Sequence, residues 1–244
     1  MNEFSLTGKT ILVTGASSGI GRQTAILISQ YGGKLYITGR NHERLENTYR
    51  QLQDSGHMQI VTDLTVATEM DTLVNNLPPL NGIVHCAGIV GPLPVKFITQ
   101  ADIDRIFGIN YHVPVNLTGK IIRKKKLLDY SSILFMSTIA TRNPYFGGAL
   151  YSGSKAALEA YSKTLAFELI SKGIRSNYLM AGLVDTPMIV NPSEKNMQEE
   201  ALDRYLKRYP LGIGEPKDVA VTILFFLSDA SKWITGTSLI LGGE

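Results

Sequence analysis

The sequence has a single cysteine, Cys86, among its 244 residues, which excludes an internal disulfide and favours a reducing compartment. It also lacks a long apolar run, because the longest stretch, near Val221–Leu227, is far too short to cross a bilayer. The first residues carry no apolar segment of the kind found in signal peptides. These features predict a soluble, cytoplasmic protein that does not enter a membrane.

Charge is also scarce in this chain. Charged residues make up 18% of it and the net charge is +3, which is too small to predict binding to nucleic acid. The one basic cluster, Arg123–Lys126, ends a helical pattern, so it either stabilises a helix C-terminus or docks an acidic partner. No linker of biased composition and no internal repeat divides the sequence, and we expect a single domain over residues 1–244.

Apolar runs of strand length alternate with segments of helical periodicity along the whole chain. The expected strands are Thr10–Val13, Leu35–Thr38, Gln59–Val61, Ile83–Cys86, Ser132–Met136, Ser176–Leu179 and Leu239–Leu241. The expected helices are Ile20–Tyr31, His42–Gln53, Ala67–Asn76, about Ala101–Lys126, Tyr151–Ser171 and Pro216–Leu227. This alternation predicts a doubly wound α/β fold, with about seven parallel strands and helices on both faces of the sheet.

A glycine-rich turn follows the first expected strand and reads Thr14-Gly15-Ala16-Ser17-Ser18-Gly19-Ile20-Gly21. Its glycines permit a tight turn and close approach of the backbone to a pyrophosphate, and the next helix offers free N–H groups. The spacing differs from the Gly-x-Gly-x-x-Gly fingerprint. Its place after the first strand nevertheless predicts a dinucleotide site. A turn that serves packing alone is the alternative.

The end of the second expected strand indicates which dinucleotide binds. No carboxylate stands there to bind a ribose 2′-hydroxyl, whereas Arg40 suits a 2′-phosphate, so NADP(H) is favoured over NAD(H). The alternative is that Arg40 is a solvated loop residue. Asp63, at the end of the third expected strand, is interpreted either as a partner of the adenine amino group or as a helix cap.

Tyr151 is the only one of the 11 tyrosines with a lysine four positions later, Lys155. On a helix these side chains lie one turn apart on a shared face. An ammonium group there, at an effective dielectric of ~20, lowers the phenol pKa from ~10 toward ~7 at most. Such a tyrosine exchanges protons at neutral pH, as general acid–base catalysis requires. From the spacing alone, an exposed pair without chemical function is the commoner case.

These two motifs and a series of shorter segments resemble the short-chain dehydrogenase/reductase family over essentially the whole chain. The resemblance is greatest to compact members such as 3-oxoacyl-[acyl-carrier-protein] reductases and sugar or alcohol dehydrogenases. The shorter matching segments are Asp63-Leu64, Ala87-Gly88, Asn110 in Phe-Gly-Ile-Asn, Arg175-Ser176-Asn177, Gly182-Leu183-Val184-Asp185-Thr186, Gly214-Glu215-Pro216, Ser228-Asp229, Ile234-Thr235-Gly236 and Gly242-Gly243.

The resemblance implies hydride transfer between NADP(H) and a carbonyl or secondary alcohol, with Tyr151 as the acid/base. Lys155 would lower the pKa of Tyr151 and bind the nicotinamide ribose, and Asn110 would bend its helix and position a water. No metal is expected. The implied cofactor contacts, several of which the turn also predicts, are Gly15, Ser17, Ser18, Gly19, Ile20, Gly21, Arg40, Asp63, Leu64, Cys86, Ala87, Gly88, Asn110, Tyr151, Lys155, Val184 and Thr186.

The chain departs from the family pattern at several positions. The serine expected thirteen residues before the tyrosine is Thr138, which keeps the hydroxyl but adds a methyl group, and Ser137 is the alternative. His85 and Cys86 replace two asparagines, and we expect a structural histidine and an inert buried thiol. Ala181 replaces a proline. These changes leave open a sensor or scaffold that has lost catalysis.

A substrate lid is expected at about residues 186–211, and an ordinary surface helix is the alternative. The expected pocket residues, Tyr145, Phe146, Leu183 and Met188, do not distinguish a 3-oxoacyl thioester from a sugar or polyol. Lys172 and the basic cluster are candidates for guiding an acidic carrier. The resemblance also implies a homodimer or homotetramer, formed through the helices near 101–126 and 151–171.

Overall fold

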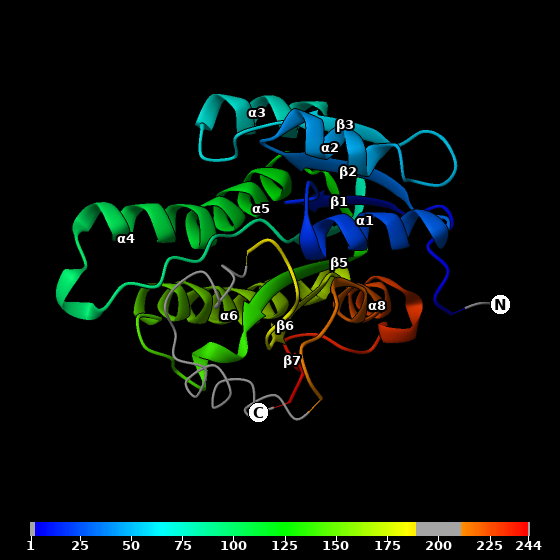
Figure 1. The fold of residues 1–244 in the computed structure, drawn as a ribbon. Coiled ribbons are helices and arrows are strands. Elements are labelled where there is room, and N and C mark those ends of the chain that lie inside the picture. Colours follow the sequence, from blue (N-terminus) through cyan, green and yellow to red (C-terminus); the bar gives the residue numbers. More distant parts are fainter. Residues whose placement is uncertain (1–2, 189–210, 244) are drawn as a thin grey trace.

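The computed structural model describes residues 3–188 and 211–243. Its sheet has seven parallel strands in the order β3-β2-β1-β4-β5-β6-β7, which confirms the doubly wound α/β fold (Figure 1). The strands are β1 (Thr10–Thr14), β2 (Lys34–Gly39), β3 (Met58–Val61), β4 (Leu80–His85), β5 (Leu127–Thr138), β6 (Arg175–Ala181) and β7 (Ser238–Leu241).

Helices cover both faces of the sheet, because the strands are apolar on both sides. One core cluster joins the sheet to α1 and α8, and the other joins it to α3, α5 and α6. The α-helices are α1 (Gly19–Gln30), α2 (His42–Tyr49), α3 (Ala67–Asn76), α4 (Gln100–Phe107), α5 (Val113–Arg123), α6 (Ala149–Leu169) and α8 (Pro216–Leu227).

Several expected ends of helices and strands differ from the structure, and the differences at β5 and in the region 101–126 have local reasons. Strand β5 begins five residues before the expected Ser132, and its register shifts in this first part, where Tyr130 has a positive φ of 63°. The expected single helix near 101–126 is instead α4, a π-helical turn over Gly108–His112, and α5. A π-turn is a single-turn insertion within a helix, and the segments on both sides of it keep helical periodicity, so the sequence pattern predicted one continuous helix.

The carboxyl ends of β1 and β4 meet at the point where the strand order reverses. Thr14 pairs in register with His85, and the loops after both strands leave the sheet at the same edge. In open α/β sheets ligands bind at this place.

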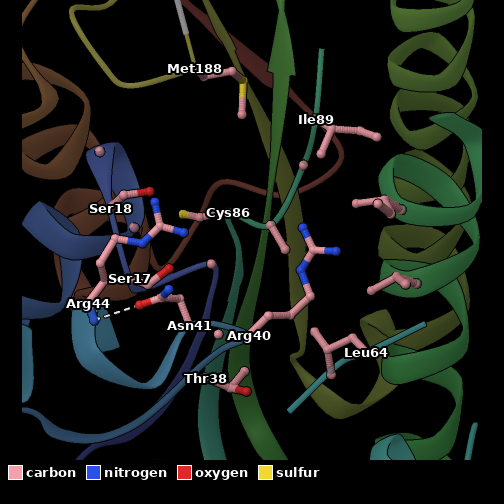
Figure 2. Close-up of a pocket in the computed structure, with 18 of the residues that line it drawn as sticks. Ser17, Ser18, Thr38, Arg40, Asn41, Arg44, Leu64, Cys86, Ile89 and Met188 are labelled. Carbon is pink, nitrogen blue, oxygen red and sulfur yellow. Dashed lines mark hydrogen bonds between the residues drawn. The ribbon is translucent and has the colours of Figure 1, made fainter. Parts of the chain in front are cut away.

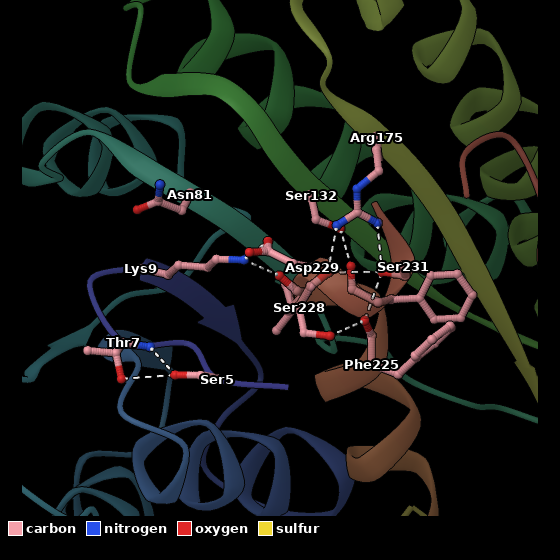
Figure 3. A network of polar contacts seen from close by, with 12 residues as sticks. Ser5, Thr7, Lys9, Asn81, Ser132, Arg175, Phe225, Ser228, Asp229 and Ser231 are labelled. Carbon is pink, nitrogen blue, oxygen red and sulfur yellow. Dashed lines mark hydrogen bonds and ion pairs between the residues drawn. The ribbon is translucent and has the colours of Figure 1, made fainter. Parts of the chain in front are cut away.

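The opposite edge is closed by a polar network around the C-terminal end of α8 (Figure 3). The buried Arg175 guanidinium donates to the Ser231 hydroxyl at 2.9 Å and to the Ser228 carbonyl at 3.4 Å. Lys9 forms an ion pair with Asp229 at 2.6 Å. The bond to Ser228 satisfies one of the carbonyl groups that the helix end leaves without intrahelical partners.

Candidate active site

The turn between β1 and α1 approaches the loop after β4 so closely that only glycine fits. Gly15 has a φ of +65°, and a Cβ there would lie 2.7 Å from the Ala87 nitrogen. A Cβ on Gly21 would lie 2.3 Å from the Gly15 oxygen. The Ala87 N–H donates to the Thr14 hydroxyl at 3.2 Å, which ties the two loops together. The glycines therefore shape the turn, as the sequence predicts.

A cavity opens beside this turn, between the carboxyl ends of β1, β2 and β4 (Figure 2). It is lined by thirteen of the seventeen expected cofactor residues: Gly15, Ser17, Ser18, Gly19, Ile20, Gly21, Arg40, Asp63, Leu64, Cys86, Ala87, Gly88 and Thr186. The other four, Asn110, Tyr151, Lys155 and Val184, do not line it. Val184 is buried and forms a bridge with Gly214.

Two arginines, Arg40 and Arg44, border the cavity, and Figure 2 shows both side chains extending along it. Sequence reasoning identified Arg40 and missed Arg44. Arg44 lies in the first turn of α2, and the Asn41 side chain caps that helix by accepting from the Arg44 N–H at 2.8 Å. The sequence signal for Arg44 is its position in the first turn of the helix after β2, because that turn borders the cavity. The two cations suit an anionic group bound in the cavity.

Asp63 lies in the loop after β3 and does not cap α3, whose N-cap is Val66, so the interpretation of Asp63 as a helix cap was wrong. Its carboxylate accepts from the Thr65 hydroxyl at 2.6 Å and from the Thr65 N–H at 2.9 Å, and it also lines the cavity. The hydrogen bond from the Thr65 hydroxyl, with a smaller contribution from the Arg40 charge, lowers the pKa of this carboxyl. Asp63 therefore stays ionised and shapes the loop on which it lies.

Lys155 projects from α6 toward β5 and ends beside the cavity. Its ammonium donates to the Met136 carbonyl at 2.8 Å and lies 5.9 Å from the centroid of the Tyr151 ring. A Cβ on Gly88 would lie 3.4 Å from the Lys155 nitrogen, so the ammonium is adjacent to the cavity wall. Burial lowers the pKa of Lys155 to about 8. The Lys155 ammonium is thus buried next to the cavity wall, and the Tyr151–Lys155 pair is not a solvated surface pair.

Asn110 lies in the π-turn between α4 and α5, fully buried. Its side-chain oxygen accepts from the Ile89 N–H at 2.8 Å, and its amide donates to the Ile89 carbonyl at 2.9 Å and to the Ser154 hydroxyl at 3.1 Å. Ser154 in turn donates to the Tyr151 carbonyl at 2.8 Å. Asn110 thereby joins the loop after β4 to the helix that carries Tyr151 and Lys155. Sequence reasoning missed the contribution of Ser154.

The two candidate hydroxyls at the end of β5 have different partners. Ser137 donates to the Glu159 carboxylate at 2.5 Å. The Thr138 hydroxyl accepts from the Ala140 N–H at 3.2 Å, and a hydroxyl that accepts still has its own proton to donate. The structure therefore favours Thr138 over Ser137 as a donor to a bound oxygen atom.

Comparison with known proteins places the chain in a family. A family model described as enoyl-(acyl carrier protein) reductase matches residues 15–243. The chain is 33% identical over 241 residues to a 3-oxoacyl-[acyl-carrier-protein] reductase of Rickettsia felis, covering 98% of each chain. It is 32% identical over 248 residues to an L-xylulose reductase of Caenorhabditis elegans, covering 98% of this chain and 96% of the other.

Among solved structures, a dehydrogenase/reductase from Sinorhizobium meliloti superposes with a TM-score of 0.87 at 32% identity, covering 99% of this chain and 96% of the other. The chain belongs to the short-chain dehydrogenase/reductase family. It is therefore an oxidoreductase of a family that uses a nicotinamide cofactor.

The two departures at the end of β4, His85 and Cys86, leave this short-chain dehydrogenase/reductase with neutral side chains there. His85 is buried, its Nε2 lies 2.9 Å from the Thr118 hydroxyl, and its ring stacks on Phe135 with centroids 4.8 Å apart. Burial, and to a lesser degree the Lys155 charge, lowers the pKa of His85 to about 3. Desolvation raises the pKa of Cys86 to about 12. A structural histidine and an inert thiol fit these surroundings.

On the substrate side of this short-chain dehydrogenase/reductase, Met188 lines the cavity and Phe146 is 86% exposed. Most of the expected lid lies outside the described residues. Lys172 and the Arg123–Lys126 cluster precede β6 and β5, so they lie at the edge of the sheet opposite the cavity. They therefore do not border this chain's own site.

Within residues 3–188 and 211–243, no group of three or more His, Cys, Asp or Glu side chains is placed to hold a metal ion. In the same part of the chain, no helix of this short-chain dehydrogenase/reductase is both long and apolar enough to span a bilayer.

Proposed function

We propose that this protein is an NADPH-dependent reductase of a carbonyl group, with Tyr151 as the acid that protonates the carbonyl oxygen. The observation that carries the proposal is the bond from Lys155 to the Met136 carbonyl. It holds the ammonium 5.9 Å from the centroid of the Tyr151 ring and beside Gly88 in the cavity wall, at the end of the strand that also carries Thr138. An acid, a cation and a hydroxyl donor are thus supported by one helix–strand contact beside the cavity.

The residues present fit a dinucleotide. The first residues of α1, Gly19–Gly21, line the cavity, and the free N–H groups of a helix start would bind a pyrophosphate there. Arg40 and Arg44 would bind a ribose 2′-phosphate, and Asp63 the adenine amino group. The nicotinamide, when bound, supplies the hydride. Gly88 and the neighbouring Lys155 would lie beside the nicotinamide ribose, in agreement with the family resemblance.

The chain's own residues supply the proton and orient the substrate. Thr138 would donate a hydrogen bond to the carbonyl oxygen, where negative charge develops during reduction. The Lys155 ammonium stabilises the phenolate that forms as Tyr151 releases its proton. Asn110 holds the loop after β4 against α6, so that the cavity wall and the acid keep a fixed geometry.

A 3-oxoacyl thioester is the substrate class that we propose first. Relatives at about a third identity over the full chain bear the name 3-oxoacyl-[acyl-carrier-protein] reductase, and Ile89 and Met188 give the cavity an apolar side. A ketose is the second candidate, supported by the L-xylulose reductase relative. A homodimer or homotetramer is also proposed, because Phe167 and Ile170 at the end of α6 are 82% and 60% exposed.

NADPH consumption by the purified protein, measured with a panel of 3-oxoacyl thioesters and ketoses, tests the proposal. We expect turnover with at least one 3-oxoacyl thioester. An Arg40→Ala variant should bind NADPH about 10- to 100-fold more weakly, with NADH binding unchanged, because it loses a charge-assisted hydrogen bond. A protein that binds NADPH and consumes it with no compound on the panel would be a sensor or scaffold instead.

A further inference from the structure

The Ser137–Glu159 hydrogen bond joins β5 to α6 beside the site, and the proposed reaction assigns it no role. Ser137 is 5% exposed, and its hydroxyl donates to the half-buried Glu159 carboxylate at 2.5 Å. A hydrogen bond to an ionised acceptor is roughly twice as strong as a neutral one. Glu is seldom withdrawn from solvent without a polar partner, and Ser137 is the partner of Glu159 here.

Glu159 belongs to a row of three polar side chains on α6. Lys155, Glu159 and Ser162 are spaced by four and three residues, so they share one face of the helix. Lys155 donates to the Met136 carbonyl at 2.8 Å, and Ser162 lies 2.9 Å from the Ser176 hydroxyl on β6. Lys155 and Glu159 thus fix the first half of α6 against the end of β5, whereas Ser162 contacts β6 farther along the helix.

The partner of Glu159 lies between the two residues of β5 that matter most to the site. Met136 accepts from Lys155, and Thr138 carries the hydroxyl proposed to contact substrate. A shift of Ser137 therefore moves both neighbours along the same backbone. A displacement of about 1 Å at a reacting group costs up to about 100-fold in rate.

We propose that Glu159 is a positioning residue that acts through Ser137, and that Ser137 is not the donor to the substrate oxygen. The pair fixes the end of β5 against α6, so that the Lys155 ammonium, the Tyr151 phenol and the Thr138 hydroxyl keep their relative places. This role rests on the proposed carbonyl reduction.

The test compares Glu159→Ala, Ser137→Ala and the double variant with wild type, on the compound that wild type reduces fastest. Each single variant should lower kcat by about 10- to 100-fold, with KM for NADPH within about twofold. The double variant should be no slower than the singles, because residues that act as one unit are not additive. Glu159→Gln keeps an acceptor for Ser137 and should stay within about threefold of wild type.

Ser162→Ala is the matched control, since it removes another buried hydrogen bond of the same row, farther from Tyr151. It should lower the unfolding midpoint to a similar degree and leave kcat unchanged. A second readout is the pH profile of alcohol oxidation with NADP, which requires the phenolate. Loss of the pair should raise the apparent pKa of the rising limb by about half a unit or more, since the ammonium is held less firmly near the phenol. Ser162→Ala should not shift it.

Two outcomes would overturn the proposal while the wild type is active. In the first outcome, Ser137→Ala has no turnover while Glu159→Ala turns over at the wild-type rate. Ser137 would then be the hydrogen-bond donor to the substrate oxygen. Glu159→Ala with the kcat and pH profile of wild type would show that the pair positions nothing. A wild type inactive on the whole panel would overturn the proposed function, and the positioning role with it.

Discussion

Two adjacent hydroxyl residues, Ser137 and Thr138, end strand β5, and their surroundings differ. Ser137 is bound to Glu159 across the helix–strand interface, whereas Thr138 accepts from Ala140 at the carboxyl edge of the sheet. Counting residues back from Tyr151 favoured Thr138 but left Ser137 open. The choice depends on where Glu159 lies, and this is a tertiary contact that neither the spacing nor the periodicity of the sequence encodes.

Replacing Thr138 tests its role as the donor to the carbonyl oxygen. Thr138→Val keeps the shape of the side chain and removes the hydroxyl, so kcat should fall by about 100-fold or more. Thr138→Ser keeps the hydroxyl without the methyl group and should stay within about threefold of wild type or exceed it. Steady-state kinetics of both variants measure this. Equal rates for Thr138→Val and Thr138→Ser would mean that another group contacts the oxygen.

At the scale of elements, the glycine-rich turn, the doubly wound parallel sheet and the Tyr151–Lys155 helix were predictable. The reason is that each follows from local patterns: glycines after a strand, alternation of strand and helix, and a four-residue spacing. Periodicity did not reveal the break between α4 and α5, because the segments on both sides of the π-turn are helical, whereas the family resemblance implied a bend at Asn110. Ser154 and Glu159 were missed because their partners, Asn110 and Ser137, lie far away in the sequence. Arg44 was missed although its place in the first turn of the helix after β2 is a local signal.

The Arg175 network at the end of α8 offers an element-scale prediction. Arg175→Met should lower the free energy of unfolding by about 1.5–3 kcal/mol, because a buried charged donor to Ser231 and the Ser228 carbonyl is lost. Lys9→Met is the control. Its ion pair with Asp229 is more exposed, and it should cost about 0–1 kcal/mol. Urea unfolding gives both values.

Turnover should not change in either variant of this network, since the network lies at the edge of the sheet opposite the cavity. A large loss of kcat in Arg175→Met, with the fold intact, would contradict the separation of the two edges.

At the scale of the whole molecule, two buried groups make stability depend on pH in the same direction. His85 has a pKa of about 3 in the folded protein against 6.5 for a free side chain, so the unfolded state binds more protons between these values. For Lys155, the unfolded state likewise binds more protons between about pH 8 and pH 10.5, because burial lowers its pKa from 10.5 to about 8. In both windows the free energy of unfolding should rise with pH, by up to about 1.4 kcal/mol per pH unit for each group.

His85→Asn isolates the acid window. Between about pH 6 and pH 5, wild type should lose roughly 1 kcal/mol more than this variant, as measured by urea unfolding at each pH. Parallel curves for the two proteins would show that His85 is protonated in the folded state. Lys155→Met isolates the alkaline window in the same way: between about pH 8 and pH 10.5, the free energy of unfolding should rise more with pH in wild type than in this variant.

The proposed homo-oligomer also belongs to this scale. Light scattering of the purified protein should give two or four times the 26.8 kDa mass of the chain. Substituting Phe167 by Asp on the exposed side of α6 should lower that mass, because a charge in a buried apolar contact is unfavourable. If the wild-type protein has the mass of a monomer, the exposed end of α6 does not form a contact between copies of the chain.

The most direct test of the central claim is the rate of NADPH consumption by Tyr151→Phe, with the Kd for NADPH measured on the same samples. The phenol hydroxyl is the only group removed, and the ring and the cofactor cavity remain. We predict a fall in kcat of about 10²- to 10⁴-fold. The Kd should stay within about twofold of wild type. A Tyr151→Phe variant that reduces the carbonyl substrate at the wild-type rate would contradict the assignment of Tyr151 as the acid.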